Sequence, residues 1–241
     1  MSFEPQQNYQ TSKTMSSDKT IDAGLQKYMQ RVYNTMCLGL AVTGFVAFAV
    51  ANTPALFNLI FGTPLHWVVA FAPLAILWFG LSPARVYRMS NSKVKTWFYG
   101  LSVLFGMSFS VYFSLFTAES LVRVFFITSS AFAATSLYGY TTKKDLTGFG
   151  SFLFMGFIGV FIASIVNIFL GSSILQFAIS IIGVVVIAGL TAVDTQRIKQ
   201  SYSLSYGSDV NDKMATMGAL GLYINFIMMF QFLMNLMGGR E

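Results

Sequence analysis

The sequence has few charged residues: they make up 10% of its 241 positions, against about 25% in soluble globular domains. So few charges cannot cover the surface of a soluble protein of this length, which excludes a soluble enzyme and a disordered chain. Because Cys37 is the only cysteine, an internal disulfide framework and a cysteine-rich metal site are excluded as well. Five prolines without a Gly-X-Y period exclude a collagen-like protein.

Groups that could carry catalysis are equally scarce. The chain has one histidine, His66, and it has no P-loop, H-E-x-x-H or EF-hand pattern. A serine or cysteine nucleophile would need this histidine as its base, and nothing around His66 indicates such a pair. We therefore expect no enzymatic activity and no cofactor. Lysine and arginine total 15 against 9 acidic residues, but no run of five basic residues occurs, so we also expect no nucleic-acid partner.

Long apolar runs dominate instead, with 55% hydrophobic residues and a mean hydropathy of +0.63. A helix crosses a bilayer in about 20 apolar residues, so the sequence predicts an all-α integral membrane protein whose partner is the lipid bilayer. Residues 1–30 are polar and are predicted to form a disordered cytoplasmic tail, followed by a transmembrane domain over residues 31–241. Seven transmembrane helices are predicted, at residues 33–52, 65–83, 96–116, 120–141, 149–170, 173–194 and 214–237.

The basic residues are distributed unevenly between the predicted loops. Thirteen fall on the side of the N-terminus, and two, Arg123 and Arg240, fall on the other side. Because loops rich in lysine and arginine remain in the cytoplasm, the N-terminus is predicted to be cytoplasmic. With seven helices the C-terminus then lies outside.

Two acidic residues touch the predicted spans, where charge is expensive and often functional. Glu119 begins the fourth span, with Arg123 four residues later on the same helix face. Two interpretations are open. Glu119 and Arg123 form an ordinary i,i+4 ion pair, in which the acid in the first turn also interacts favourably with the helix dipole. Alternatively, the two residues lie at the outer entrance of a pathway, where the acid attracts cations.

Asp194 ends the sixth predicted span, because the 21 residues from Ser173 to Val193 already reach across a bilayer. An ordinary ion pair with Arg197 at i+3 and a functional role are both open on this spacing. Thr191, at i−3, is expected to form a polar patch with Asp194 that faces a cavity. In the seventh span Gly218, Gly221 and Asn225 share one face, which is typical of close helix packing.

Three segments resemble the Bax inhibitor-1 family, the transmembrane Bax inhibitor motif proteins, and most closely its bacterial members. They are Thr128–Gly156 (TSSAFAATSLYGYTTKKDLTGFGSFLFMG), Asp194–Gln196 at the end of the sixth span, and Ala219–Phe230 (ALGLYINFIMMF). With the seven-span layout, the similarity covers about residues 25–238. It implies six helices around a central seventh, and a pH-sensitive Ca²⁺ leak gated by two aspartates and a basic latch.

Asp194 matches the first aspartate of that pattern, whereas Asn225 stands where the second is expected. Two close carboxylates share a proton and so sense pH. An aspartate–asparagine pair has one titrating group, so we expect a pH response that is weaker or shifted toward acid. The latch is not identified by sequence, and its candidates are Arg85, Arg88 and Arg197.

The resemblance leaves two functions to compare. The first is a slow cation leak, with Ca²⁺ as the transported ion and gating near Asp194 and Asn225. The second is a non-transporting interaction protein that modulates a membrane-bound protease or a stress response, with the polar tail as its handle. The likeness to bacterial members predicts a location in the bacterial inner membrane.

Overall fold

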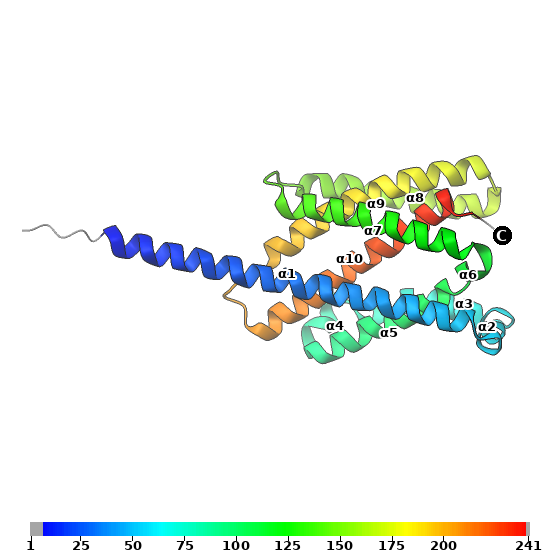
Figure 1. Cartoon of the computed structure of the whole chain (residues 1–241), viewed down its shortest axis with the longest axis horizontal. Helices are drawn as coiled ribbons and strands as arrows, with labels where there is room; N and C mark the ends of the chain where they lie inside the picture. The colour runs from blue at the N-terminus through cyan, green and yellow to red at the C-terminus, as the bar shows by residue number, and fades with distance from the viewer. Residues whose placement is uncertain (1–6, 240–241) are drawn as a thin grey trace, which may run out of the picture.

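A computed structural model of the protein describes residues 7–239, and every regular element in this part of the chain is a helix (Figure 1). Arg240, one of the two cations predicted on the outer side, lies outside the described residues. The elements are α1 (Gln7–Ala51), α2 (Pro54–Phe61), α3 (Leu65–Ala75), the π-helix η1 (Ile76–Gly80), α4 (Pro83–Arg88), α5 (Asn91–Phe109), α6 (Tyr112–Leu115), α7 (Ala118–Thr141), α8 (Thr147–Leu170), α9 (Ser173–Ser201) and α10 (Ser208–Met237).

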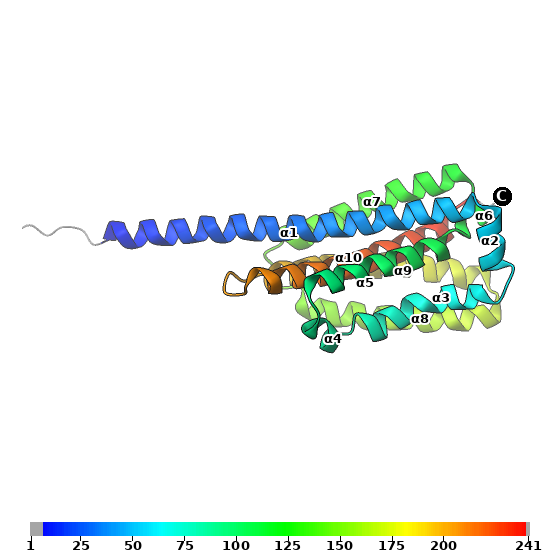
Figure 2. The same cartoon turned by 90° about the horizontal axis from the view of Figure 1, so that it is seen from below.

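In residues 7–239, six helical segments are long and apolar enough to cross a membrane: residues 23–51 of α1, α5 with α6, and α7, α8, α9 and α10. The second predicted span, residues 65–83, is instead made by α3 and η1, whose 16 residues reach only about 24 Å. These two elements lead the chain from the end of the bundle where α1 stops back to the end where α5 begins (Figure 2). Together with α2, which is bent against them by 80°, they form a broken pair of helices that brings the number of candidate spans in the described chain to seven if it is counted as one span.

Pro73 accounts for the irregular second span. Proline has no backbone N–H, so the carbonyl oxygen of Val69 lacks its usual helical donor. The Ser108 hydroxyl of α5 donates to that oxygen at 3.1 Å. The helix then widens into a π-turn directly after Ala75, as happens where the regular hydrogen-bond ladder is interrupted. The break is therefore stabilised by packing against α5.

The central helix is α10, which packs directly on α1, α5, α7 and α9. More of α10 is buried than of the other candidate spans, and Leu222, Tyr223, Met229 and Met234 are fully enclosed. The Tyr223 hydroxyl lies 2.7 Å from Thr43 Oγ1 on α1, so a polar group inside the core has a partner. The outer helices α8 and α3 pack mainly on α9 and α5.

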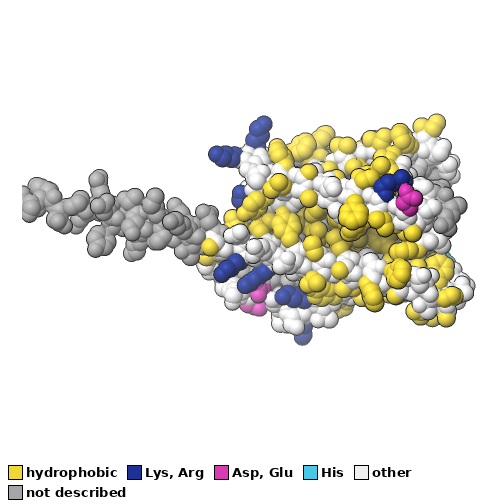
Figure 3. Space-filling view, viewed as in Figure 1, with side chains coloured by type: hydrophobic (Ala, Val, Ile, Leu, Met, Phe, Trp, Pro, Cys, Tyr) yellow, Lys and Arg dark blue, Asp and Glu magenta, His cyan; other side chains and the backbone are white. Residues whose placement is uncertain are grey.

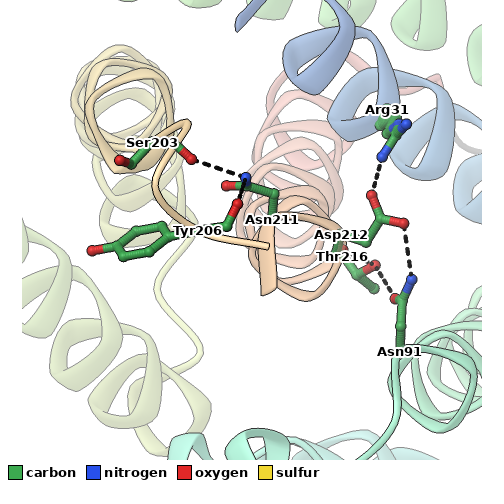
Figure 4. Close-up of polar contacts among 7 residues, drawn as sticks. All are labelled: Arg31, Asn91, Ser203, Tyr206, Asn211, Asp212 and Thr216. Carbon is green, nitrogen blue, oxygen red and sulfur yellow. Dashed lines mark hydrogen bonds and ion pairs between the residues drawn. The ribbon is translucent and has the colours of Figure 1, made fainter. Parts of the chain in front are cut away.

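Basic side chains gather at the end of the bundle where α1 enters, here called the basic end (Figure 3). Asp212 of α10 joins three helices there (Figure 4). The Asp212 carboxylate forms an ion pair with Arg31 of α1 and accepts a hydrogen bond of 3.4 Å from Asn91 Nδ2 of α5. The Thr216 hydroxyl, one turn along α10, lies 3.5 Å from the Asn91 side-chain oxygen. This cluster fixes the spacing of α1, α5 and α10 at the basic end.

Helix α1 begins at Gln7, so residues 7–30, where the sequence predicts a disordered tail, are helical in the structure. They continue the first transmembrane helix without a break and extend beyond the bundle (Figure 1). A helix that is already nucleated in the bundle propagates cheaply into flanking residues. Whether the segment is mobile stays a prediction.

Candidate functional site

A cavity of about 610 Å³ lies where α8, α9 and α10 meet, and Asp194 is part of its lining. Most of the other lining residues are apolar or small. Asp194 and Arg197 of α9 are the ionisable members, and Asn225 of α10 is the amide member. The opposite wall is α8, where Gly150 lies so close to α9 that a Cβ there would meet Val193 at 2.8 Å. The site is therefore a largely apolar cavity whose lining contains one carboxylate and one guanidinium group.

Asp194 is held by a neighbour on each side. Asn225 Nδ2 donates to Asp194 Oδ2 at 2.9 Å, and Arg197 Nη1 lies 3.6 Å from Asp194 Oδ1. The i,i+3 pair expected from the sequence is therefore present. Asn225 is 7% exposed, whereas the Asp194 side chain keeps 28% of its surface. Since each carboxylate oxygen can accept about two hydrogen bonds, Asp194 retains acceptor sites toward the cavity.

The helix positions explain why these side chains meet. Gly218 and Asn225, seven residues apart, share the face of α10 that packs on α9, and a Cβ on Gly218 would lie 3.1 Å from Ile198. Gly221 lies off this contact, with open space at its Cβ position. The close approach at Gly218 lets the short Asn225 amide reach Asp194, as small residues allow between membrane helices.

Asp194, where the sixth predicted span ends, does not end its helix, and the position of the membrane boundary at this residue stays a prediction. Helix α9 continues to Ser201 because Thr195, Gln196 and Ile198 are buried against its neighbours. The predicted patch of Thr191 with Asp194 is wrong. Thr191 is fully buried outside the cavity lining, and its hydroxyl donates to the Ile187 carbonyl oxygen at 2.8 Å. The Thr191 hydroxyl therefore has its hydrogen-bond partner within α9 and does not contribute to the cavity.

The candidate latch residues lie in different places. Arg197 lines the cavity and contacts Asp194. Arg85 and Arg88 are exposed on α4 and are not among the lining residues. The structure thus brings one of the three candidates to the acid, and the role of a latch stays a prediction.

At the other end of the bundle, Glu119 and Arg123 are both exposed on α7. Arg123 Nη2 donates to Ser120 Oγ at 3.3 Å, and the same Oγ accepts from the backbone of Gly239 at 2.9 Å. These contacts tie the start of α7 to the end of the described chain. A cation-attracting mouth at Glu119 stays a prediction.

Gln196 is a positioning residue that the sequence reasoning missed. Its side chain accepts from Leu146 N at 2.8 Å and donates to the Lys144 carbonyl oxygen at 2.7 Å, fixing the loop from α7 to α8. In the same loop, hydrogen bonds from the side chain and backbone of Thr147 lower the pKa of the exposed Asp145 carboxyl. The sequence feature that could have indicated this role is the position of Gln196, two residues after Asp194.

Replacing Gln196 with leucine is expected to lower the free energy of unfolding by about 1–3 kcal/mol. The change keeps the side-chain size but leaves the Lys144 carbonyl and the Leu146 N–H without their partner. Denaturant titration in detergent micelles measures the loss. Gln200→Leu, exposed one turn later on α9, is the matched control and should remain within about 0.5 kcal/mol of the native protein. Equal stability of the two variants would contradict a stabilising role for the two hydrogen bonds between Gln196 and the α7–α8 loop.

Comparison with known sequences identifies the family. A family model described as "Inhibitor of apoptosis-promoting Bax1" matches residues 25–241. The chain belongs to the Bax inhibitor-1 family. The matched region contains the Asp194–Asn225 cavity and leaves out the polar N-terminal residues.

Bacterial relatives of this Bax inhibitor-1 family member align over nearly their whole length. A protein of Caulobacter vibrioides is 46% identical over 238 residues, covering 93% of each chain. A protein of Rickettsia prowazekii is 44% identical over 96% of this chain and 97% of its own. The inner membrane protein YbhL of Escherichia coli is 40% identical over 91% of this chain and 94% of YbhL. Together with the apolar helices, these matches make the chain a membrane protein.

Proposed function

We propose that this Bax inhibitor-1 protein is a slow cation leak that passes Ca²⁺ and is gated by protonation at Asp194. The observation that carries the proposal is a partly exposed carboxylate on a membrane-crossing helix, hydrogen-bonded to Asn225 and lining a cavity of about 610 Å³. A charge inside a membrane segment costs about 2.5–3.5 kcal/mol on insertion scales, so such residues by default have a function. Family membership supports the same reading.

The chemistry of the cavity suits a cation and a proton. Ca²⁺ takes oxygen ligands, carboxylates above all, and Asp194 offers its free acceptor sites to the cavity. Protonation removes the negative charge that attracts the cation and ends the pairing with Arg197. The leak is therefore open with Asp194 charged and closes in acid.

The orientation of the leak follows the basic residues. The cations of the described transmembrane domain lie largely at the basic end, and such ends remain in the cytoplasm. We infer a cytoplasmic N-terminus and, from the printed name of YbhL, a bacterial inner membrane.

One observation favours the second function, an interaction protein that acts on a membrane-bound protease or another membrane protein. Helix α1 extends beyond the bundle from Gln7, as a handle for a partner would (Figure 1). The flux measurement described next separates the two functions, because a non-transporting protein gives no Ca²⁺ entry above that of empty liposomes. Neither function requires an enzymatic activity.

The test is Ca²⁺ entry into liposomes that hold the purified protein, from pH 5 to pH 8. Native protein is expected to exceed empty liposomes and to lose flux at the acid end. Asp194→Asn, which has no charge to lose, is expected to pass about tenfold less Ca²⁺ at neutral pH, equivalent to about 1.4 kcal/mol, and to show no pH dependence. Asp209→Asn removes an exposed acid paired with Lys213 and serves as the matched control. Equal flux from native protein and Asp194→Asn would contradict the proposal.

A further inference from the structure

A second hollow runs along the other side of α10, between α1 and α7, and is here called the α1–α7 groove. It consists of two cavities of about 950 and 510 Å³ that share four lining residues, Leu40, Gly44, Phe125 and Phe226. Phe226 of α10 belongs to the floor, and α1 and α7 are the walls. The face of the molecule in Figure 3 is hollowed and apolar along this line. None of the residues of the Asp194 cavity lines the groove.

The groove opens toward lipid rather than toward water. Its lining includes apolar side chains that are more than half exposed, among them Phe48 of α1 and Phe126 and Leu137 of α7. Along α1 the larger cavity reaches from Gln26 to Gly44, about 27 Å of helix, close to the hydrocarbon thickness of a bilayer. A lateral groove of this length within a membrane-spanning domain is lined for hydrocarbon chains.

The basic end of the groove is suited to an anionic headgroup. Tyr140 belongs to the lining there, and Lys199 of α9 lies over its ring at 4.9 Å while donating to its carbonyl oxygen at 2.8 Å. Gln26 and Gln30 are further polar members of the lining. Arg31 is committed to Asp212 on α10, whereas Lys199 meets only a neutral carbonyl in its hydrogen bond. Among the side chains that the structure describes, Lys199 forms no ion pair, and it adjoins the groove through its contact with Tyr140.

We propose that the α1–α7 groove binds an anionic phospholipid, with an acyl chain between α1 and α7 and its phosphate beside Lys199 at the basic end. The occupant is a phospholipid because the groove faces the hydrocarbon layer and its charge complements a phosphate.

The bound chain lies on a hydroxyl relay that leads to α9. Tyr33 OH lies 2.7 Å from Ser136 Oγ, which lies 2.9 Å from Thr195 Oγ1. Thr195 donates its proton to the Thr191 carbonyl oxygen. Because each hydroxyl has one proton, Ser136 donates to Thr195 and Tyr33 donates to Ser136. The lipid therefore touches the residues that connect α1 and α7 to the helix of Asp194.

Cys37, the only cysteine of the chain, is exposed and lines the groove, so its alkylation reports an empty groove. Native protein in detergent micelles is treated with N-ethylmaleimide while dioleoyl-phosphatidylglycerol or dioleoyl-phosphatidylcholine is added. Phosphatidylglycerol at about ten times its dissociation constant is expected to slow alkylation about tenfold, because about one groove in ten then remains empty. Phosphatidylcholine, which has the same chains and no net charge, is expected to need a higher concentration.

Two variants test the two parts of the site. Lys199→Gln is expected to raise the phosphatidylglycerol concentration for half protection about fivefold, the effect of one lysine at an anionic lipid surface, and to change the phosphatidylcholine concentration less, because choline offsets the charge of that lipid's phosphate. Lys93→Gln, an exposed lysine outside the groove lining, is the matched control. Gly44→Leu fills the junction of the two cavities, where an added Cβ meets no atom within 4 Å, and is expected to weaken protection by both lipids.

Three results would overturn the proposal. The first is equal protection of Cys37 by the two lipids, and the second is protection by phosphatidylglycerol that Lys199→Gln leaves unchanged. The third is slow alkylation without lipid that speeds up on dilution of the protein, which would assign the groove to a second copy of the chain. A Gly44→Leu protein that keeps native thermal stability excludes misfolding as the reason for lost protection.

Discussion

Gly139→Ala is expected to lower the free energy of unfolding by about 2–3 kcal/mol, the cost of overpacking a tight contact. A Cβ on Gly139 of α7 would lie 2.2 Å from the carbonyl oxygen of Ala192 on α9, and this neighbour is backbone. The two helices must separate to admit even a methyl group. The loss exceeds the gain of about 1 kcal/mol that alanine normally brings over glycine inside a helix.

The control for Gly139 is another helical glycine with space around it. Gly221 of α10 has no atom within 4 Å of its Cβ position, so Gly221→Ala is expected to be neutral or to stabilise the protein by up to about 1 kcal/mol. Denaturant titration of both variants in detergent micelles measures the difference. If Gly139→Ala were as stable as Gly221→Ala, the close approach of α7 and α9 would be wrong.

Asn225→Asp is expected to make the Ca²⁺ flux steeply dependent on pH near neutrality. The native site has one carboxylate, with an amide donating to it at 2.9 Å. In the variant two carboxylates meet at hydrogen-bond distance, and such a pair shares a proton because both cannot be charged at little cost. The response of the variant therefore moves toward neutral pH, whereas the native response remains at the acid end of the range.

Flux from pH 5 to pH 8 measures this difference, with native protein and variant reconstituted at equal density. Asn235→Asp adds the same charge to an exposed position of α10 and should leave the native profile unchanged. A native protein that already responds steeply near neutral pH would show that a second titrating group acts in place of the missing aspartate.

The transmembrane layout could be predicted from the sequence because long apolar runs depend only on hydropathy. The exception is the second span, where Pro73 removes a backbone donor and the helix widens into η1. The proline is visible in the sequence, but Ser108 of α5, which donates to the Val69 oxygen, is 39 residues from Val69 and is found beside it only in the folded chain. Helix α9 likewise extends past Asp194 because of burial against neighbouring helices, which hydropathy does not report.

The candidate site was predicted only in part. The pair of Asp194 with Arg197 follows from helix spacing, and its meeting with Asn225 was expected from the family resemblance. The contacts of Gln196 with the α7–α8 loop were missed, since they join residues about 50 positions apart. The close contact at Gly139 could not be predicted either, because the sequence does not show which glycine of an apolar helix faces the backbone of a neighbouring helix.

The most direct test of the gate is the ratio of Ca²⁺ entry through native protein to that through Asp194→Asn at neutral pH. Both proteins are reconstituted at the same protein-to-lipid ratio after equal thermal stability in detergent has been established. The Asp194 gate predicts a ratio of about ten. A ratio of one, with both proteins well above empty liposomes, would show that Ca²⁺ passes without the Asp194 carboxylate and would contradict the account.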